Sequence, residues 1–281
     1  MRILVFGGTG KIGRNLVANL AAAGAEAVPA ARQAGAGGID LDLADAEAVA
    51  RAAHGFDAAY LMTPIGPEET AIGLAAHEAL VAAGLEKIVY LAIHNLEMLR
   101  RIPHFEAKIP IKQAVLARPR AVVLEPNFFF QNDLMVRSAI TGPGIYPLPV
   151  GSSGVWSIDV ADIARAACRA LMQDDWDGTA VPLCGSERLT GPVLAANWSA
   201  ALGRPVVYAG DGIDPFIGGM RASGIRMSDW MEEDFRLMMQ VTQELGCPAT
   251  AQDIAASTAI IGRAPRTHAA FAAATVEETT Q

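Results

Sequence analysis

The sequence of 281 residues lacks the features that mark several large classes of protein. It has no apolar run long enough to span a membrane, because Gly, Glu or His interrupts each alanine-rich stretch. It opens directly on an apolar segment that we interpret as a strand, so we expect no signal peptide. These absences favour a cytoplasmic protein.

Cysteine and basic residues are also scarce. The three cysteines, Cys168, Cys184 and Cys247, are an odd number without metal-ligand spacing, so we expect reduced thiols and no metal site. The formal net charge of −8 argues against nucleic acid as the main partner, although it is compatible with a local basic cleft around an anionic cofactor. No Gly-x-Ser-x-Gly elbow is present, which disfavours a hydrolase.

The sequence does contain a regular alternation of short apolar runs and amphipathic stretches. With 52% hydrophobic residues, the chain is able to bury a large core, as one large domain or as a domain with a lobe. No internal repeat or low-complexity linker is evident. Strands are predicted within residues 2–6, 26–32, 39–45, 57–62 and 87–92, with helices at 15–23 and 68–83 and another opening at 45. This order predicts an α/β fold, a Rossmann-type doubly wound parallel sheet.

Three glycines spaced three apart join the first strand to the first helix. Gly7 suits the tight turn, Gly10 allows backbone to approach a ligand, and Gly13 allows the helix to pack on the strand. The N–H groups that open the helix would then face a pyrophosphate. We therefore expect the whole turn to bind a dinucleotide through Gly7, Thr9, Gly10, Lys11, Ile12 and Gly13.

An ordinary glycine-rich turn is the alternative interpretation. A Walker-type phosphate loop is a poor match, because Lys11 is followed by Ile12 where Ser or Thr is needed.

The second predicted strand ends at Arg32, where the adenosine ribose of a dinucleotide would lie. An NAD site places a carboxylate there, whereas a cation suits the 2′-phosphate of NADP. No acid lies between Ala27 and Ile39, so we favour NADP(H) over NAD(H). A solvated surface arginine is the alternative. Thr63 and Pro64 follow the fourth strand and are also expected beside the cofactor.

The order of these elements resembles that of the NmrA-like family, in the atypical branch of the short-chain dehydrogenase/reductase superfamily that includes the isoflavone-reductase and quinone-reductase types. The glycine turn is the most specific part of the resemblance, which extends over nearly the whole chain. It implies that Asp42 and Leu43 bracket the adenine. Three further segments resemble family motifs: residues 124–132 (LEPNFFFQN), 157–164 (SIDVADIA) and 202–205 (LGRP).

The superfamily's Ser-Tyr-Lys group is incomplete here. The resemblance implies that Lys108 is the lysine that holds the nicotinamide ribose, but His104 stands where the tyrosine belongs, four residues earlier, and Ala92 or Ile93 replaces the serine. His104 or a water is the candidate proton donor. Because proline favours the first turn of a helix, Pro110 predicts a helix beginning near residue 109, with His104 in the preceding loop. A solvated lysine and a surface histidine are the alternatives.

Several other side chains are candidates for a substrate pocket. His94 and Asn95 follow a strand end, although a simple turn asparagine is an equal alternative. Aromatic candidates are also present, although a core role is the more common one for such side chains; they are Phe128, Phe129, Trp156 and Trp230.

Two domains are expected. Residues 1–185 form the NAD(P)-binding domain, and residues 186–281 form a mainly helical lobe for substrate, to which the segment 127–155 contributes. The polar tail after Thr275 is expected to fray.

The resulting hypothesis is an NADPH-dependent oxidoreductase that transfers hydride to a small apolar carbonyl, conjugated alkene, quinone or imine. A non-catalytic NADP(H)-sensing regulator, which the family also contains, explains the missing Ser and Tyr better. A nucleotide-sugar epimerase normally keeps the Tyr and ranks third. The expected partner is a small molecule; a homodimer, the hydride face and the identity of the substrate stay open.

Overall fold

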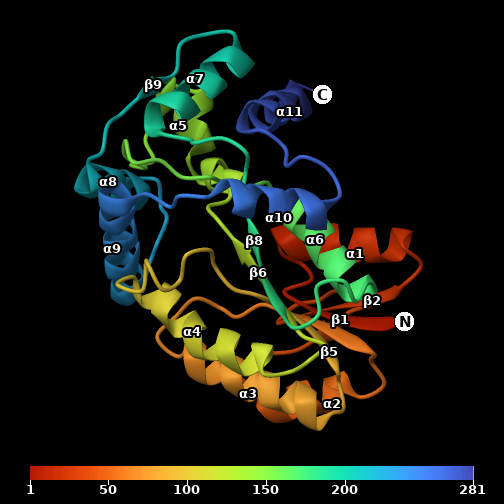
Figure 1. Ribbon diagram of the computed structural model, residues 1–281. Coiled ribbons are helices and arrows are strands. Elements are labelled where there is room, and N and C mark those ends of the chain that lie inside the picture. The colour runs from red at the N-terminus through yellow and green to blue at the C-terminus, as the bar shows by residue number, and fades with distance from the viewer. Residues whose placement is uncertain (281) are drawn as a thin grey trace. The chain divides into compact units, whose positions relative to one another are not determined.

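A computed structural model describes residues 1–280 (Figure 1). The chain forms two compact units. Unit 1 comprises residues 1–126, 160–183 and 256–263, and unit 2 comprises 127–159, 184–255 and 264–281. The chain thus enters unit 2 directly after residue 126, returns to unit 1 for residues 160–183, and leaves it again near the boundary expected at residue 185. Helix α10 (Ala251–Ile261) passes from unit 2 into unit 1.

Unit 1 is built on a seven-stranded parallel sheet with the order β3-β2-β1-β4-β5-β6-β8. The order reverses between β1 and β4, as in a doubly wound fold. The predicted α/β Rossmann-type sheet is confirmed. Its strands are β1 (Arg2–Phe6), β2 (Glu26–Ala31), β3 (Ile39–Asp40), β4 (Ala58–Leu61), β5 (Lys87–Leu91), β6 (Val122–Pro126) and β8 (Thr179–Leu183).

Helices cover both faces of this sheet. α1 (Lys11–Ala22) packs with α6 (Val160–Met172) on one face, and α2 (Ala46–Ala53), α3 (Glu69–Ala82) and α4 (Pro103–Leu116) cover the other (Figure 1). Every residue of β4, β5 and β6 is consequently buried. Continuous apolar strands are what a parallel sheet covered on both faces requires.

Two helix starts differ from the sequence prediction. α1 begins at Lys11, four residues earlier than expected, because Gly10 takes the N-cap position. α4 begins at Pro103 and runs through Pro110, so the prediction of a helix starting near residue 109 was wrong. Pro103 is the proline that occupies the first turn, where its missing N–H costs nothing. His104 is therefore helical.

Unit 2 is mainly helical and contains a two-stranded parallel sheet formed by β7 (Ile145–Tyr146) and β9 (Val207–Tyr208). α11 (His268–Thr280) packs against α7 (Gly191–Leu202) and is a full helix where a frayed tail was expected after residue 275; Gln281 lies outside the described residues. The remaining elements are a 3₁₀ helix, η1 (Phe130–Val136), with α5 (Arg137–Thr141), α8 (Ile213–Ala222) and α9 (Asp229–Leu245).

Within residues 1–280, no helix combines the length and the apolar character that crossing a bilayer demands. All three cysteines are buried free thiols.

Candidate functional site

A cleft of about 900 Å³ lies at the carboxyl ends of β1, β2 and β4 in unit 1. This is the edge of a doubly wound sheet where ligands bind, and the volume lies within the range of cofactor pockets. The cleft brings together most of the residues predicted to hold a cofactor. It is lined by Phe6, Gly7, Thr9, Gly10, Ala30, Ala31, Arg32, Gln33, Leu41, Asp42, Leu43, Met62, Thr63, Pro64 and Ile65.

The glycine turn borders the cleft, and it leaves no room for a side chain at Gly7 or Gly13. Gly7 adopts a left-handed φ of 67°. A Cβ atom at Gly13 would lie 2.2 Å from the carbonyl oxygen of Gly7, so α1 packs against the turn only because position 13 is glycine. Gly10 caps α1 without a side chain, and the first turn of the helix carries no acid. A helix start without a side-chain cap and without a nearby acid suits an anion, and the turn fits a pyrophosphate.

Arg32 follows β2 and is an exposed cation on the wall of the cleft. Its guanidinium takes part in none of the hydrogen bonds or ion pairs found within residues 1–280. The loop that follows is anchored, since Asp40 Oδ1 accepts a hydrogen bond of 2.8 Å from the Ala34 N–H. Asp42, also on the wall, accepts one of 3.0 Å from the Ala44 N–H. Arg32 is therefore an exposed cation without an ion-pair partner among residues 1–280, and hydrogen bonds to Asp40 and Asp42 hold the segment that follows it.

Four of the predicted cofactor residues do not line the cleft. Lys11 is exposed at the start of α1, while Ile12 and Gly13 are buried in the same helix. Lys108 is only 5% exposed and lies in α4.

Lys108 is buried beside the cleft in an ion pair. Its ammonium pairs with Glu69 of α3 and donates a hydrogen bond of 3.0 Å to Thr63 Oγ1. Burial lowers the pKa of Lys108, and the charge of Glu69 opposes that shift. Thr63 lines the cleft, so Lys108 adjoins the cavity through Thr63. Glu69 was not predicted as a site residue from the sequence, because an acid in the first turn of a helix is common.

His104 lies one turn before Lys108 and is 5% exposed, with its ring 4.7 Å from that of Phe105 in an edge-on arrangement. The alternative of a surface histidine is therefore excluded.

His94 and Asn95 follow β5 in a tight connection. The His94 side chain is buried, and its backbone N–H donates to the Pro126 carbonyl at 3.0 Å. Asn95 has a φ of 59° and, within residues 1–280, is the one residue other than glycine in this region of the backbone map. Its carbonyl accepts from the Leu99 N–H at 3.0 Å. This geometry supports a turn role for Asn95, because asparagine tolerates the left-handed region.

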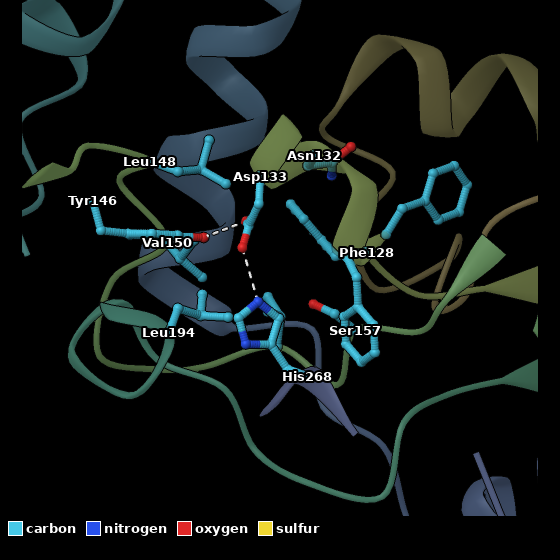
Figure 2. Close-up of a pocket in the computed structure, with 12 residues that line it drawn as sticks. Phe128, Asn132, Asp133, Tyr146, Leu148, Val150, Ser157, Leu194 and His268 are labelled. Carbon is cyan, nitrogen blue, oxygen red and sulfur yellow. Dashed lines mark hydrogen bonds and ion pairs between the residues drawn. The ribbon is translucent and has the colours of Figure 1, made fainter. Parts of the chain in front are cut away.

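The aromatic candidates lie in unit 2. Phe128 and Phe129 line a cavity of about 10 Å³, room for no more than one water (Figure 2). Trp156 and Trp230 are half-buried and line neither this cavity nor the cleft of unit 1. The small cavity is therefore not the substrate pocket predicted for these residues.

A buried carboxylate borders this small cavity and was not foreseen. Asp133 accepts a hydrogen bond of 2.7 Å from Tyr146 Oη and lies 2.8 Å from His268 Nε2 (Figure 2). It also accepts a hydrogen bond of 2.6 Å from Trp198 Nε1. Asn197 Nδ2 lies 3.1 Å from the other ring nitrogen of His268, an arrangement that favours a proton on Nε2. Burial and Asp133 raise the pKa of Tyr146.

Two more buried carboxylates flank the start of α6. Asp159 pairs with Arg266 at 2.9 Å in unit 2, and Asp162 pairs with Arg263 in unit 1. Within the described residues, no group of three or more His, Cys, Asp or Glu side chains is arranged to hold a metal ion.

Comparison with known proteins gives one family and several relatives. A model of the NmrA-like family matches residues 1–244. The NAD(P)H azoreductase of Xenophilus azovorans is 30% identical over 252 residues, which cover 84% of this chain and 86% of that protein. The (4-alkanoyl-5-oxo-2,5-dihydrofuran-3-yl)methyl phosphate reductase of Streptomyces griseus is 30% identical over 227 residues, 75% of this chain and 78% of that protein.

Solved structures share the fold over nearly the full length. The NADPH-dependent quinone oxidoreductase of Escherichia coli, complexed with NADPH, matches with a TM-score of 0.82 and 20% identity, over 99% of this chain and 100% of that one. The Citrobacter triphenylmethane reductase, complexed with NADP(H), matches with a TM-score of 0.83 and 18% identity, over 98% and 100% of the two chains.

Proposed function

The chain belongs to the NmrA-like family, and on that premise we propose that it is an NADPH-dependent reductase of small conjugated acceptors. The observation that carries the proposal is the cleft, which combines an uncapped helix start at a glycine turn with an open arginine at the end of β2. The named relatives support the reductase class, since the azoreductase uses NAD(P)H and the second relative is also a reductase.

Different residues of the cleft would bind different parts of the dinucleotide. The N–H groups at the start of α1, reached past Gly7 and Gly10, would hold the pyrophosphate. Arg32 would pair with the 2′-phosphate, because no acid competes for it in the segment between β2 and β3. Asp42 and Leu43 would bracket the adenine. When bound, the cofactor supplies the hydride.

The proton that completes the reduction has two proposed sources. His104 is close in sequence to Lys108 and buried on the same helix, and an imidazole suits proton transfer near neutral pH. A water in the cleft is the alternative source. Lys108 would hold Thr63 in place beside the nicotinamide half of the dinucleotide, because its ammonium donates a hydrogen bond to this cleft-lining residue.

The substrate class follows from what the relatives' substrates share. An azo group and an unsaturated lactone ring both contain a double bond that accepts hydride at one atom and a proton at the other. A quinone, named for one of the structural neighbours, reacts in the same way. We therefore propose an acceptor with a conjugated C=C, C=O or N=N bond.

The activity test follows NADPH absorbance with the purified protein and a panel of a quinone, an azo dye, an enone and an imine. Oxidation by at least one of them is expected. If NADPH binds tightly but none of the panel oxidises it, the NADP(H)-sensing alternative replaces the reductase. If neither NADPH nor NADH binds, both interpretations fail.

Arg32→Ala tests the cofactor preference. We expect the Kd for NADPH to rise about tenfold or more, because a charge-assisted contact to phosphate is lost, while the Kd for NADH changes by less than about twofold. Calorimetric titration with both cofactors measures this. Arg51→Ala is the matched control, since Arg51 is exposed on α2 and pairs with Glu47 outside the cleft. Equal losses for NADPH and NADH would remove the preference.

A further inference from the structure

A histidine is buried where two helices pack on one face of the sheet of unit 1. We propose that His77 makes the packing of α3 on α4 sensitive to acid, because protonation of its ring places a second cation near Arg118 in a buried position. The inference concerns the fold of unit 1 and does not rest on the proposed function.

The position of His77 on α3 follows from the contacts between the two helices, which lie side by side (Figure 1). Thr70 Oγ1 donates to the Ala107 carbonyl of α4 at 2.9 Å. One turn later, Gly73 leaves room for α4, since a Cβ atom there would lie 2.3 Å from Ile111 Cδ1. Residues three and four apart share one face of a helix, so His77 continues this row toward the end of α4.

The ring of His77 is shielded from water but not fully hydrogen-bonded. The residue is 7% exposed, and its Nε2 atom is buried without a hydrogen-bond partner within residues 1–280. A neutral imidazole leaves one nitrogen unsatisfied in this position. An imidazolium carries a proton on both nitrogens and a full charge, so the same surroundings penalise it much more.

The charged groups that act on His77 add to this penalty. Arg118 follows α4, and its guanidinium forms no hydrogen bond or ion pair with an acid in the described part of the chain. Glu78, the next residue of α3, is exposed. Burial lowers the pKa of His77 and Arg118 lowers it further, while Glu78 opposes the shift. No other charged group among residues 1–280, from α2 or from the sheet, shifts this pKa.

The lowered pKa makes the folded protein sensitive to acid. In the unfolded chain, His77 binds a proton as pH falls through its ordinary pKa of about 6.5, whereas the folded protein binds it only at lower pH. The free energy of unfolding is therefore unaffected by His77 above about pH 6.5 and falls as pH drops below that value. Because α3 also carries Glu69 and α4 carries Lys108, acid loosens the helix packing that holds this ion pair.

Urea unfolding at about pH 7.5 and about pH 5.5 tests the proposal with His77→Leu, which is apolar and does not titrate. Between the two pH values, the unfolding equilibrium constant of the wild type should rise about five- to tenfold more than that of the variant. Tenfold is the limit for one proton at one pH unit below the ordinary pKa. A difference below about twofold overturns the proposal.

His54→Leu is the matched control. His54 is exposed at the end of α2, so the variant should keep the pH dependence of the wild type to within about twofold. If His77→Leu does not fold by circular dichroism, His77→Gln replaces it, because glutamine is also uncharged at both pH values. A pH dependence unchanged by His77→Gln then overturns the inference.

Hydrogen exchange shows where the protein responds to acid. At about pH 5.5 the amides of α3 and α4 should be less protected in the wild type than in His77→Leu, by more than at about pH 7.5. The comparison is made at equal pH, so the intrinsic exchange rates match. Amides of α6, on the other face of the sheet, should lose less protection. Equal losses in α6 would overturn the role of the α3–α4 packing.

Discussion

Two buried carboxylates, Glu69 in unit 1 and Asp133 in unit 2, show how burial serves different ends in one chain. Asp133 uses both oxygens with three partners and borders a cavity of about 10 Å³ (Figure 2). Glu69 uses one oxygen for both Lys108 and Thr63, while its other oxygen, Oε2, has no hydrogen-bond partner within residues 1–280. Through Thr63 the Glu69 network adjoins a cleft of about 900 Å³.

The two carboxylates differ in how many of their oxygens are hydrogen-bonded, and the one that uses both oxygens has a structural role. The partners of Asp133 come from β7, α7 and α11, so one carboxylate ties together parts of unit 2 that are distant in sequence. The Glu69 network is incomplete by itself and borders open space. Incomplete polar networks are costly, and they persist where a function uses them.

Asp133→Ala tests the structural role of Asp133, and we expect it to have the largest effect on the free energy of unfolding. Removing the carboxylate leaves Tyr146, Trp198 and His268 without their shared acceptor, so we expect a loss of about 4 kcal/mol in the free energy of unfolding. Urea unfolding measures it. Asp214→Ala is the control, because its side chain is 82% exposed and its pair with Arg236 should contribute less than about 1 kcal/mol. A loss below about 1 kcal/mol at Asp133 would end the structural interpretation.

Lys108→Met tests the buried ion pair of Lys108 and Glu69. It leaves the Glu69 carboxylate buried without its cation, and we expect a loss of about 3 kcal/mol in unfolding free energy. The double variant Lys108→Met/Glu69→Leu should recover most of that loss, since an apolar pair replaces a buried ion pair with little change in stability. Urea unfolding of the single and double variants checks this. Arg51→Met is the control, because Arg51 is exposed on α2 and its pair with the exposed Glu47 should contribute less than about 1 kcal/mol. Failure of the double variant to recover stability would contradict the argument.

A matched pair of tyrosines gives the smallest effects. Tyr146 Oη donates to Asp133, so Tyr146→Phe should cost about 1 kcal/mol or slightly more. The Tyr60 hydroxyl is buried without a hydrogen-bond partner in the described chain, and burial raises its pKa. Tyr60→Phe should therefore be neutral or stabilise by up to about 1 kcal/mol. Thermal unfolding of both variants measures the contrast, and equal losses would show that the Tyr60 hydroxyl has a partner.

Much of the cleft was predictable because its residues follow strands. Parallel strands share one carboxyl edge, so the glycine turn, Arg32 and Thr63 converge once the strands are identified. Gln33, Met62 and Ile65 also line the cleft and were missed, although each is next in sequence to a predicted residue.

Other features were beyond local reasoning. Asp133 and His268 are separated by 135 residues, and nothing in either segment indicates the other. The proline rule was applied to Pro110 when Pro103 was the residue that begins α4, because local sequence does not decide between two allowed starts.

The α/β class, the turn at the start of α1 and the NmrA-like family were all predictable from the sequence, because they depend on apolar periodicity, on the freedom of glycine and on shared motifs. The pairing of Lys108 with Glu69 and the hydrogen bond from the Thr63 hydroxyl to Glu69 depend on the tertiary structure. The orientation of a polar group depends on its neighbours and on burial, and these residues come from two helices, α3 and α4, and from the segment that follows β4.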